Sequence, residues 1–207
     1  MTEQQRYNFL LAQKLIAEFE KRNLDGYYCE TKQDALKKTL ELMPKDAVIS
    51  CGGSATLYEI GLREALRNEG YNFLDPNSAS GAAEKDKIAH QALSADYYLM
   101  SSNAITEQGE LVNADGYGNR VSALIFGPKN VIVVAGMNKI THDLDAAIER
   151  TKKYAARMIL LKFKKDYPGL DKLDEAAKVA ASQLVITSKS TTKGRIKVIL
   201  VGESLGF

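Results

Sequence analysis

A glycine-rich turn with two hydroxyl side chains, Gly52-Gly53-Ser54-Ala55-Thr56, is the first candidate binding element in the sequence. The apolar run 47–50 before it predicts a buried strand, and the spacing of apolar residues over 57–66 predicts a helix after it. Glycines let the backbone approach a ligand closely, and the free N–H groups of a first helical turn favour an anion. The residues expected to contact that anion are Gly52, Gly53, Ser54 and Thr56.

The alternative is a purely structural role: a tight strand-to-helix turn in which Ser54 only caps the helix. The turn lacks the Gly-Lys-Ser/Thr of a Walker motif and the spacing of a dinucleotide fingerprint. The residue before it, Cys51, is either a thiol nucleophile at a helix start or a small buried thiol.

A second concentration of polar side chains occupies residues 101–120, directly after a predicted strand over 96–100. In open α/β sheets, ligands bind beyond the carboxyl ends of the strands, so this loop-like segment predicts one wall of a pocket. Asn and Asp at turns also bond their own backbone, which is the alternative. The candidate residues are Asn103, Thr106, Glu107, Asn113, Asp115, Asn119 and Arg120.

Two of these side chains have specific chemical roles open to them. Glu107 would act as a general base or nucleophile if it is partly desolvated. Arg120 would clamp a phosphate or carboxylate through its planar guanidinium, unless it is held in a salt bridge to Asp115 or Glu107.

Composition excludes several classes of protein. The 207 residues carry 28 Lys+Arg and 26 Asp+Glu, a net charge of +2, which argues against a broad nucleic-acid-binding face. With 2 Cys and 2 His the chain favours neither a disulfide scaffold nor a structural zinc site, and an iron–sulfur cluster needs about four thiolates. We therefore expect no metal and no intrinsic cofactor.

The sequence also predicts a protein of a reducing compartment, and it predicts no membrane segment. The longest strongly apolar run, 131–136, is far below the ~20 residues of a spanning helix, and the amino-terminal residues show no targeting pattern. The two cysteines are most simply reduced thiols, so we expect a cytoplasmic protein.

Short apolar segments alternate with amphipathic ones along the chain, which predicts an α/β fold with a largely parallel sheet. The clearest central strand is 131–135. We expect one domain over 1–207, with a helix at 5–22 packed on it and a turn at Asp25-Gly26. The other expected helices are 31–43, 84–94, 141–158 (capped by Thr141) and 170–182, and the other expected strands are 27–30, 71–74, 184–187 and 196–201.

Taken together, these motifs resemble the lactate-utilization (LUD) domain family in its short stand-alone form, from about residue 5 to Phe207. The resemblance is carried by Gly52-Gly53-Ser54-Ala55-Thr56-Leu57, Ser102-Asn103-Ala104-Ile105-Thr106-Glu107-Gln108-Gly109, Leu111-Val112-Asn113-Ala114-Asp115-Gly116, Gly118-Asn119-Arg120, Gly136-Met137-Asn138-Lys139-Ile140 and the ending Val201-Gly202-Glu203-Ser204-Leu205-Gly206-Phe207.

The resemblance implies a three-layer α/β fold similar to ribose-5-phosphate isomerase, glucosamine-6-phosphate deaminase and the CoA-transferases. Those proteins bind sugar phosphates or acyl-CoA beside glycine-rich strand ends, and several use a catalytic carboxylate. By this analogy Glu107 is the reactive carboxylate, and Gly116, Asn138 and Lys139 join the ligand-binding residues.

The family's named role is the oxidation of L-lactate to pyruvate beside partner proteins that carry iron–sulfur clusters. Many relatives have cysteines before the last strands, but residues 168–193 contain none here, and 156–183 diverges from the family pattern. Electrons would therefore move through a partner.

Two functions follow as hypotheses. In the first, the protein binds or converts a small carboxylate, phosphate or CoA ester in lactate or organic-acid utilization. In the alternative, it is a non-catalytic accessory subunit that docks onto an iron–sulfur lactate-oxidising complex. The oligomeric state is left open by the sequence.

Overall fold

The fold is built on a parallel sheet whose long central strand is β7 (Asn130–Gly136). The computed structural model describes residues 1–163 and 166–207, and within them six strands form this sheet in the order β1-β10-β7-β4-β2-β3. Every pairing between neighbours is parallel. The other strands are β1 (Asp25–Cys29), β2 (Val48–Cys51), β3 (Asn72–Leu74), β4 (Tyr97–Met100) and β10 (Ile196–Val201).

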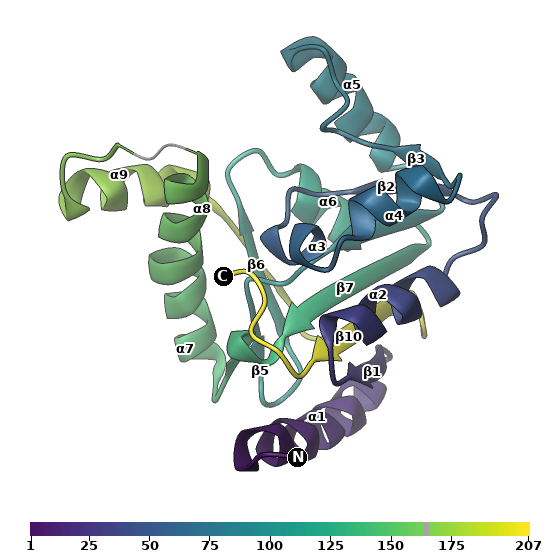
Figure 1. Cartoon of the computed structure of the whole chain (residues 1–207). Coiled ribbons are helices and arrows are strands. Elements are labelled where there is room, and N and C mark those ends of the chain that lie inside the picture. Colours follow the sequence, from purple (N-terminus) through teal and green to yellow (C-terminus); the bar gives the residue numbers. More distant parts are fainter. Residues whose placement is uncertain (164–165) are drawn as a thin grey trace.

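Alternating side chains of β7 enter two separate cores, one on each face of the sheet. Val131 and Val133 pack with residues of α1, α5 and α6, whereas Ile132 and Val134 pack with residues of α2, α3 and α4. This alternation follows from the two-residue period of a strand. The three-layer arrangement expected from the sequence is therefore confirmed (Figure 1). These helices are α1 (Glu3–Lys21), α2 (Lys32–Glu41), α3 (Ala55–Glu59), α4 (Leu62–Asn68), α5 (Ala82–Ala92) and α6 (Asn119–Phe126).

A second, smaller sheet stands beside the first, in the order β8-β5-β6-β9. Small alanines let the helices α7 to α9 approach it closely, and Figure 1 shows α7 and α8 as one continuous column along this side. Its elements are β5 (Ala104–Thr106), β6 (Leu111–Asp115), the 3₁₀ turn η1 (Met137–Lys139), β8 (Ile140–Thr141), α7 (Leu144–Glu149), the π-helical segment η2 (Arg150–Ala155), α8 (Ala156–Phe163), α9 (Leu170–Ala180) and β9 (Gln183–Thr187).

This second sheet corrects the interpretation of residues 101–120 as a loop. Ile105, Leu111 and Val112 are fully buried, and β5 and β6 form an antiparallel hairpin around them. The polar residues of the segment lie in β6 (Asn113, Asp115), at the start of α6 (Asn119, Arg120) and in the turns. The two strands therefore form a packed wall.

Three further expectations differ from the structure at element ends. Asp25 and Gly26 begin β1, since the chain already turns at Asn23, which has a φ of 60°. The helix expected over 57–66 is interrupted at Gly61, which adopts a φ of 72°. The cap of α7 is Asp143, whose carboxylate accepts from Ala146 N at 2.9 Å, whereas Thr141 lies in β8.

Within the described part of the chain, no helix combines the length and apolar character that crossing a bilayer requires.

The helix α1 is a packed part of the domain, since Leu15 is fully buried in the core while Leu10 on the same helix is 58% exposed. We expect Leu15→Ala to lower the free energy of unfolding by about 2–5 kcal/mol, because it leaves a cavity in the core. Leu10→Ala is the matched control and is expected to stay within about 0.5 kcal/mol of the parent. Urea denaturation of both variants measures this, and equal, small losses would contradict the packing of α1.

Candidate functional site

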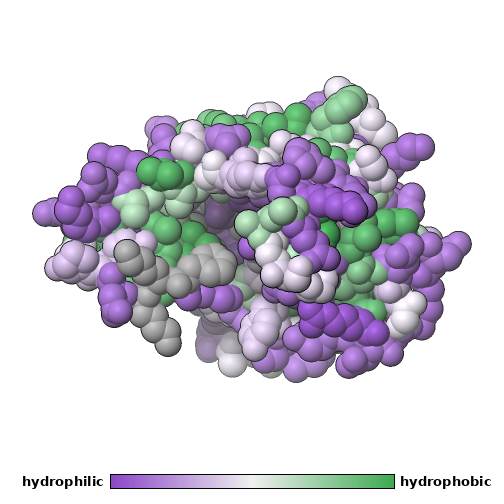
Figure 2. Space-filling model, turned by 90° about the horizontal axis from the view of Figure 1, so that it is seen from above, coloured by the Kyte–Doolittle hydropathy of each residue, from purple (hydrophilic) through white to green (hydrophobic). Residues whose placement is uncertain are grey.

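A cavity of about 320 Å³ lies where the carboxyl ends of β2 and β4 meet the second sheet. One wall is the turn after β2, another is the segment from β6 into α6, and the far wall comes from η2, α8 and α9. The space-filling view shows the surface hollowed on the face seen from above, with hydrophobic residues along one side of the hollow and hydrophilic residues along others (Figure 2). This is the edge at which open α/β sheets bind ligands.

Arg120 organises one side of this cavity by using all of its donors. A guanidinium has five N–H groups, and five different oxygens accept from Arg120. They are Asp115 Oδ1, Asn113 Oδ1, Asn103 Oδ1 and the carbonyl oxygens of Ser101 and Ala114. The ion pair to Asp115 measures 2.8 Å and both side chains are about nine-tenths buried. Arg120 therefore forms the salt bridge to Asp115 that the sequence left open, and it lines the cavity as a fixed charge.

Asp115 extends this network to the start of α6. Its second oxygen accepts from Val121 N at 2.9 Å, at the amino end of that helix. Gly52 completes the packing, because a Cβ there would lie 3.1 Å from Arg120 Cδ. The glycine thus makes room for the arginine stem.

Lys139 is the other buried cation of the cavity and is 3% exposed. Its Nζ donates to Thr56 Oγ1 and to Ser101 Oγ, each at 2.9 Å. Among the residues that the structure describes, no carboxylate lies within ion-pair distance of Nζ. This ammonium is therefore desolvated without a counterion, which is costly for a buried charge.

Burial and neighbouring charges act together on this lysine. Desolvation, followed by the positive charges of Arg150 and Arg120, lowers the pKa of Lys139 to about 7, while Glu59 opposes the shift. Arg150 donates to the backbone carbonyls of Asn103 and Asn138, and burial lowers its pKa as well. Arg150 is not part of the cavity lining, but its charge acts on Lys139, so the surroundings of this lysine carry more positive than negative charge.

Thr151 contributes a hydroxyl that has no hydrogen-bond partner among the residues that the structure describes. It is 1% exposed and lines the cavity, and Oγ1 is the one buried side-chain polar atom in the described residues without a hydrogen-bond partner. Thr151 belongs to the π-helical segment η2, and such segments occur frequently at functional sites. An unsatisfied buried hydroxyl costs about 1–3 kcal/mol, so a ligand or water that bonds it would be favoured.

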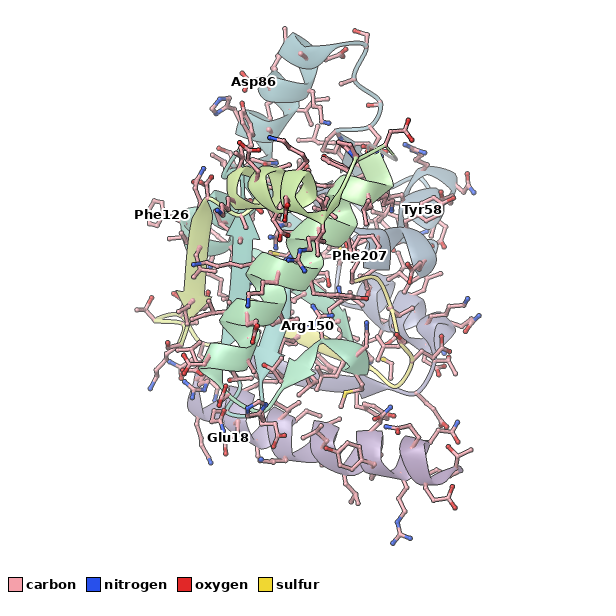
Figure 3. The ribbon with its side chains drawn as sticks, turned by 90° about the vertical axis from the view of Figure 1, so that its left-hand side faces the viewer. Glu18, Tyr58, Asp86, Phe126, Arg150 and Phe207 are labelled. Atoms are coloured by element: carbon pink, nitrogen blue, oxygen red, sulfur yellow. The ribbon has the colours of Figure 1, made fainter. Side chains whose placement is uncertain are left out.

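The last residues of the sequence form the remaining wall. Asn138 holds them, since Oδ1 accepts from Leu205 N at 3.0 Å and Nδ2 donates to Gly206 O at 3.3 Å. Gly206 has a φ of 58° and lies against Thr56, with a hypothetical Cβ only 2.6 Å from Oγ1. Phe207 lines the cavity, and Figure 3 shows it on the same side of the molecule as Arg150.

The structure brings most of the sequence-predicted site residues to this cavity. Those that line it are Gly53, Ser54, Asn103, Asp115, Gly116, Asn119, Arg120 and Lys139. Thr56, Asn113 and Asn138 support these residues through the hydrogen bonds to Lys139, Arg120 and the last residues. Ser54 also caps α3, accepting from Leu57 N at 3.3 Å, as the alternative interpretation of the turn expected.

Thr106 and Glu107 lie elsewhere, on the β5–β6 hairpin. Thr106 is fully buried and bonds Glu110, whereas Glu107 pairs with Lys14 of α1 at 2.7 Å. Neither belongs to the cavity lining within the described residues. The reactive role of Glu107 stays a prediction, and its position ties the hairpin to α1.

Cys51 is 2% exposed, and burial raises the pKa of its thiol to about 12. At neutral pH it is a protonated buried thiol, the second of the two roles that the sequence left open. In the described part of the chain, no group of three or more His, Cys, Asp or Glu side chains is placed to hold a metal ion.

The sequence interpretation missed Ser101, Thr151, Arg150 and Phe207. Ser101 directly follows β4, so the rule that singled out residues after a strand would have found it. Thr151 fell on a helical stripe interpreted as core, and only the cavity beside it distinguishes it.

The fold and the site together define a class of protein. It is a three-layer α/β domain with a polar, positively charged cavity at the carboxyl ends of its parallel strands. The chain belongs to the LUD domain family, whose model matches residues 12–201. The family expected from the sequence motifs is thereby confirmed.

A solved structure supports the fold. A DUF162 family protein from Deinococcus radiodurans is similar over 94% of this chain and 98% of that chain, with a TM-score of 0.56 and 11% identity. The delta subunit of eIF2B from Chaetomium thermophilum matches 69% of this chain and 57% of that chain at 16% identity, and its TM-score of 0.38 carries no argument. No curated protein matches the sequence.

Removal of Arg120 should destabilise the protein strongly, because it leaves buried Asp115 without its counterion. We expect Arg120→Ala to lower the free energy of unfolding by about 3–5 kcal/mol in urea denaturation. Arg157→Ala is the control, since the Arg157–Asp174 pair is partly exposed and such pairs contribute below about 1 kcal/mol. Equal losses in the two variants would refute the network.

Glu107→Gln tests whether the hairpin carboxylate takes part in ligand binding. Because Glu107 lies in a surface ion pair outside the cavity lining, we expect the variant to fold and to keep the anion-induced rise in Tm described below. If the variant loses that rise while the Tm of the free protein is unchanged, Glu107 takes part in ligand binding.

Proposed function

We propose that the cavity binds a small organic anion, and that Lys139 with Arg150 and Arg120 supplies the positive field. The observation that carries this proposal is the burial of Lys139 without a counterion. Isolated buried ammonium groups are unfavourable in the free protein, so a carboxylate or phosphate that enters the cavity restores the missing charge.

The polar groups around the cavity support an oxygen-rich ligand. The Thr151 hydroxyl is unpartnered, and Ser54 and Asn119 add polar side chains to the lining. The apolar part of the wall comes from Ala155, Ile159 and other residues of η2 and α8. A small acid with a short carbon chain matches this combination.

The volume of the cavity further restricts which ligands fit. Ligand cavities span roughly 300–1,000 Å³, and a volume of about 320 Å³ lies at the lower end of that range. A small carboxylate or phosphate fits, whereas a CoA ester would place only its acyl end inside. We propose that the ligand is an organic acid of the kind that lactate utilization involves, as the family resemblance implies.

Thermal unfolding with and without anions tests this proposal. A ligand at about 100 times its Kd stabilises the folded state by roughly 2.7 kcal/mol, a rise of several degrees in Tm. We expect L-lactate, glycolate or inorganic phosphate to produce such a rise, and Lys139→Met to abolish it. Lys152→Met on the exposed face of η2 is the matched control and should retain the rise.

The pH dependence gives an independent check. An anion prefers the protonated amine, so affinity should fall as pH rises through the pKa of Lys139 at about 7. If no anion stabilises the protein, or if Lys139→Met responds like the parent, the binding proposal fails. The accessory-subunit alternative, with an iron–sulfur partner, would then be favoured.

A further inference from the structure

We propose that the ε-amine of Lys139 is a nucleophile that forms an imine with the carbonyl carbon of an aldehyde or 2-oxo acid held in the cavity. This inference rests on the proposed function, because the carboxylate of such a substrate takes the anion position. It narrows the substrate class to organic anions that carry a carbonyl group beside the acid.

The hydrogen bonds of Lys139 match a neutral amine. The Thr56 hydroxyl donates to Leu205 O and the Ser101 hydroxyl donates to Ser102 O, each at 3.4 Å. Both hydroxyl oxygens are therefore left to accept from Lys139 Nζ, which they do at 2.9 Å. An amine has two N–H groups and one lone pair, whereas an ammonium has three N–H groups.

The third position on Nζ has no hydrogen-bond partner among the described residues. In the ammonium form this position holds a buried, unsatisfied N–H, which is unfavourable. In the amine form it holds the lone pair that attacks a carbonyl carbon. Burial and the missing third partner therefore favour the reactive amine form of this lysine.

The electrostatic surroundings act in the same direction. The charged groups that influence Lys139 are Arg120 from α6, Arg150 from η2 and Glu59 from α3. Desolvation and neighbouring cations are the two usual ways in which proteins activate a lysine amine. Arg120 and Arg150 remain charged while the amine is neutral, so the field for a substrate carboxylate persists.

The unpartnered Thr151 hydroxyl is available to hydrogen-bond the oxygen of the substrate carbonyl group. It lines the same cavity and can donate to the carbonyl oxygen as negative charge develops there. We assign Thr151 as the polarising residue.

The step balances without an oxidant or reductant. The nitrogen lone pair forms an N–C bond, and the carbonyl π electrons move to oxygen, which takes the proton released by the nitrogen. The resulting carbinolamine loses its hydroxyl with one further proton as water, and the nitrogen lone pair closes the C=N bond. One water is released for each imine formed.

Borohydride trapping on the intact protein tests this step. Glyoxylate is the probe and glycolate is the matched control, since it has the same carboxylate but a hydroxyl in place of the carbonyl. After reduction, peptide mass spectrometry locates the secondary amine. At pH 7 we expect labelling at Lys139 to exceed that at Lys152 by at least about tenfold, because roughly a thousand times more of a lysine with a pKa of about 7 is neutral than of an ordinary lysine.

Two further readouts separate this inference from simple anion binding. At saturating glyoxylate, labelling should increase with pH through about 7, opposite to anion affinity, because the amine and not the ammonium reacts. Thr151→Val removes only the unpartnered hydroxyl, so it should fold normally and label several-fold more slowly, because the negative charge that develops on the carbonyl oxygen loses one donor.

The outcomes distinguish the two proposals. Glycolate stabilisation without glyoxylate label at Lys139 overturns the imine and leaves anion binding intact. Label spread over exposed lysines, with Lys139 unmodified, also overturns the imine. If neither acid stabilises the protein and Lys139 is not labelled, the proposed function and the imine fail together.

Discussion

The guanidinium of Arg120 is the interaction on which the rest of the site depends. It joins the end of β4, the strand β6 and the start of α6 through five acceptors, and its ion pair with Asp115 is buried. A buried arginine is tolerated only when its donors are satisfied, so these backbone segments must converge on it. These contacts hold together the wall of the cavity that runs from the end of β4 through β6 into α6.

A cavity held in this way can keep a second cation unsatisfied. Lys139 lines the same cavity as Arg120 and donates to two hydroxyl oxygens in place of a carboxylate. Glu59 is the acid that acts on Lys139, but it forms no ion pair with Nζ and so does not neutralise the lysine. In its protonated form this lysine is an unfavourable buried charge, and binding an anion or losing the proton relieves it. Functional sites often retain a locally unfavourable free energy, which the packing of the sheets around them offsets.

Much of the fold could be predicted from local patterns. The alternation of 131–135 with amphipathic helices indicates a parallel sheet, and the caps at Thr2 and Thr31 follow standard chemistry. The β5–β6 hairpin could not, because its short strands interleave polar residues such as Asn113 and Asp115 with the buried apolar ones. Within the site, the glycine turn and Asn103 were found by their place after strands, whereas Thr151 lay on a stripe indistinguishable from core.

The sequence by itself determined the family, the α/β class and the edge of the sheet where the candidate site residues gather, since strand ends and glycine turns are local features. Only the tertiary structure decided what each charge does. Lys139 meets Thr56 from 83 positions away and Ser101 from 38, and Glu107 is drawn to Lys14 across 93. Burial and charge pairing are properties of such distant contacts, and no spacing along the chain encodes whether a lysine has a carboxylate or two hydroxyls beside it.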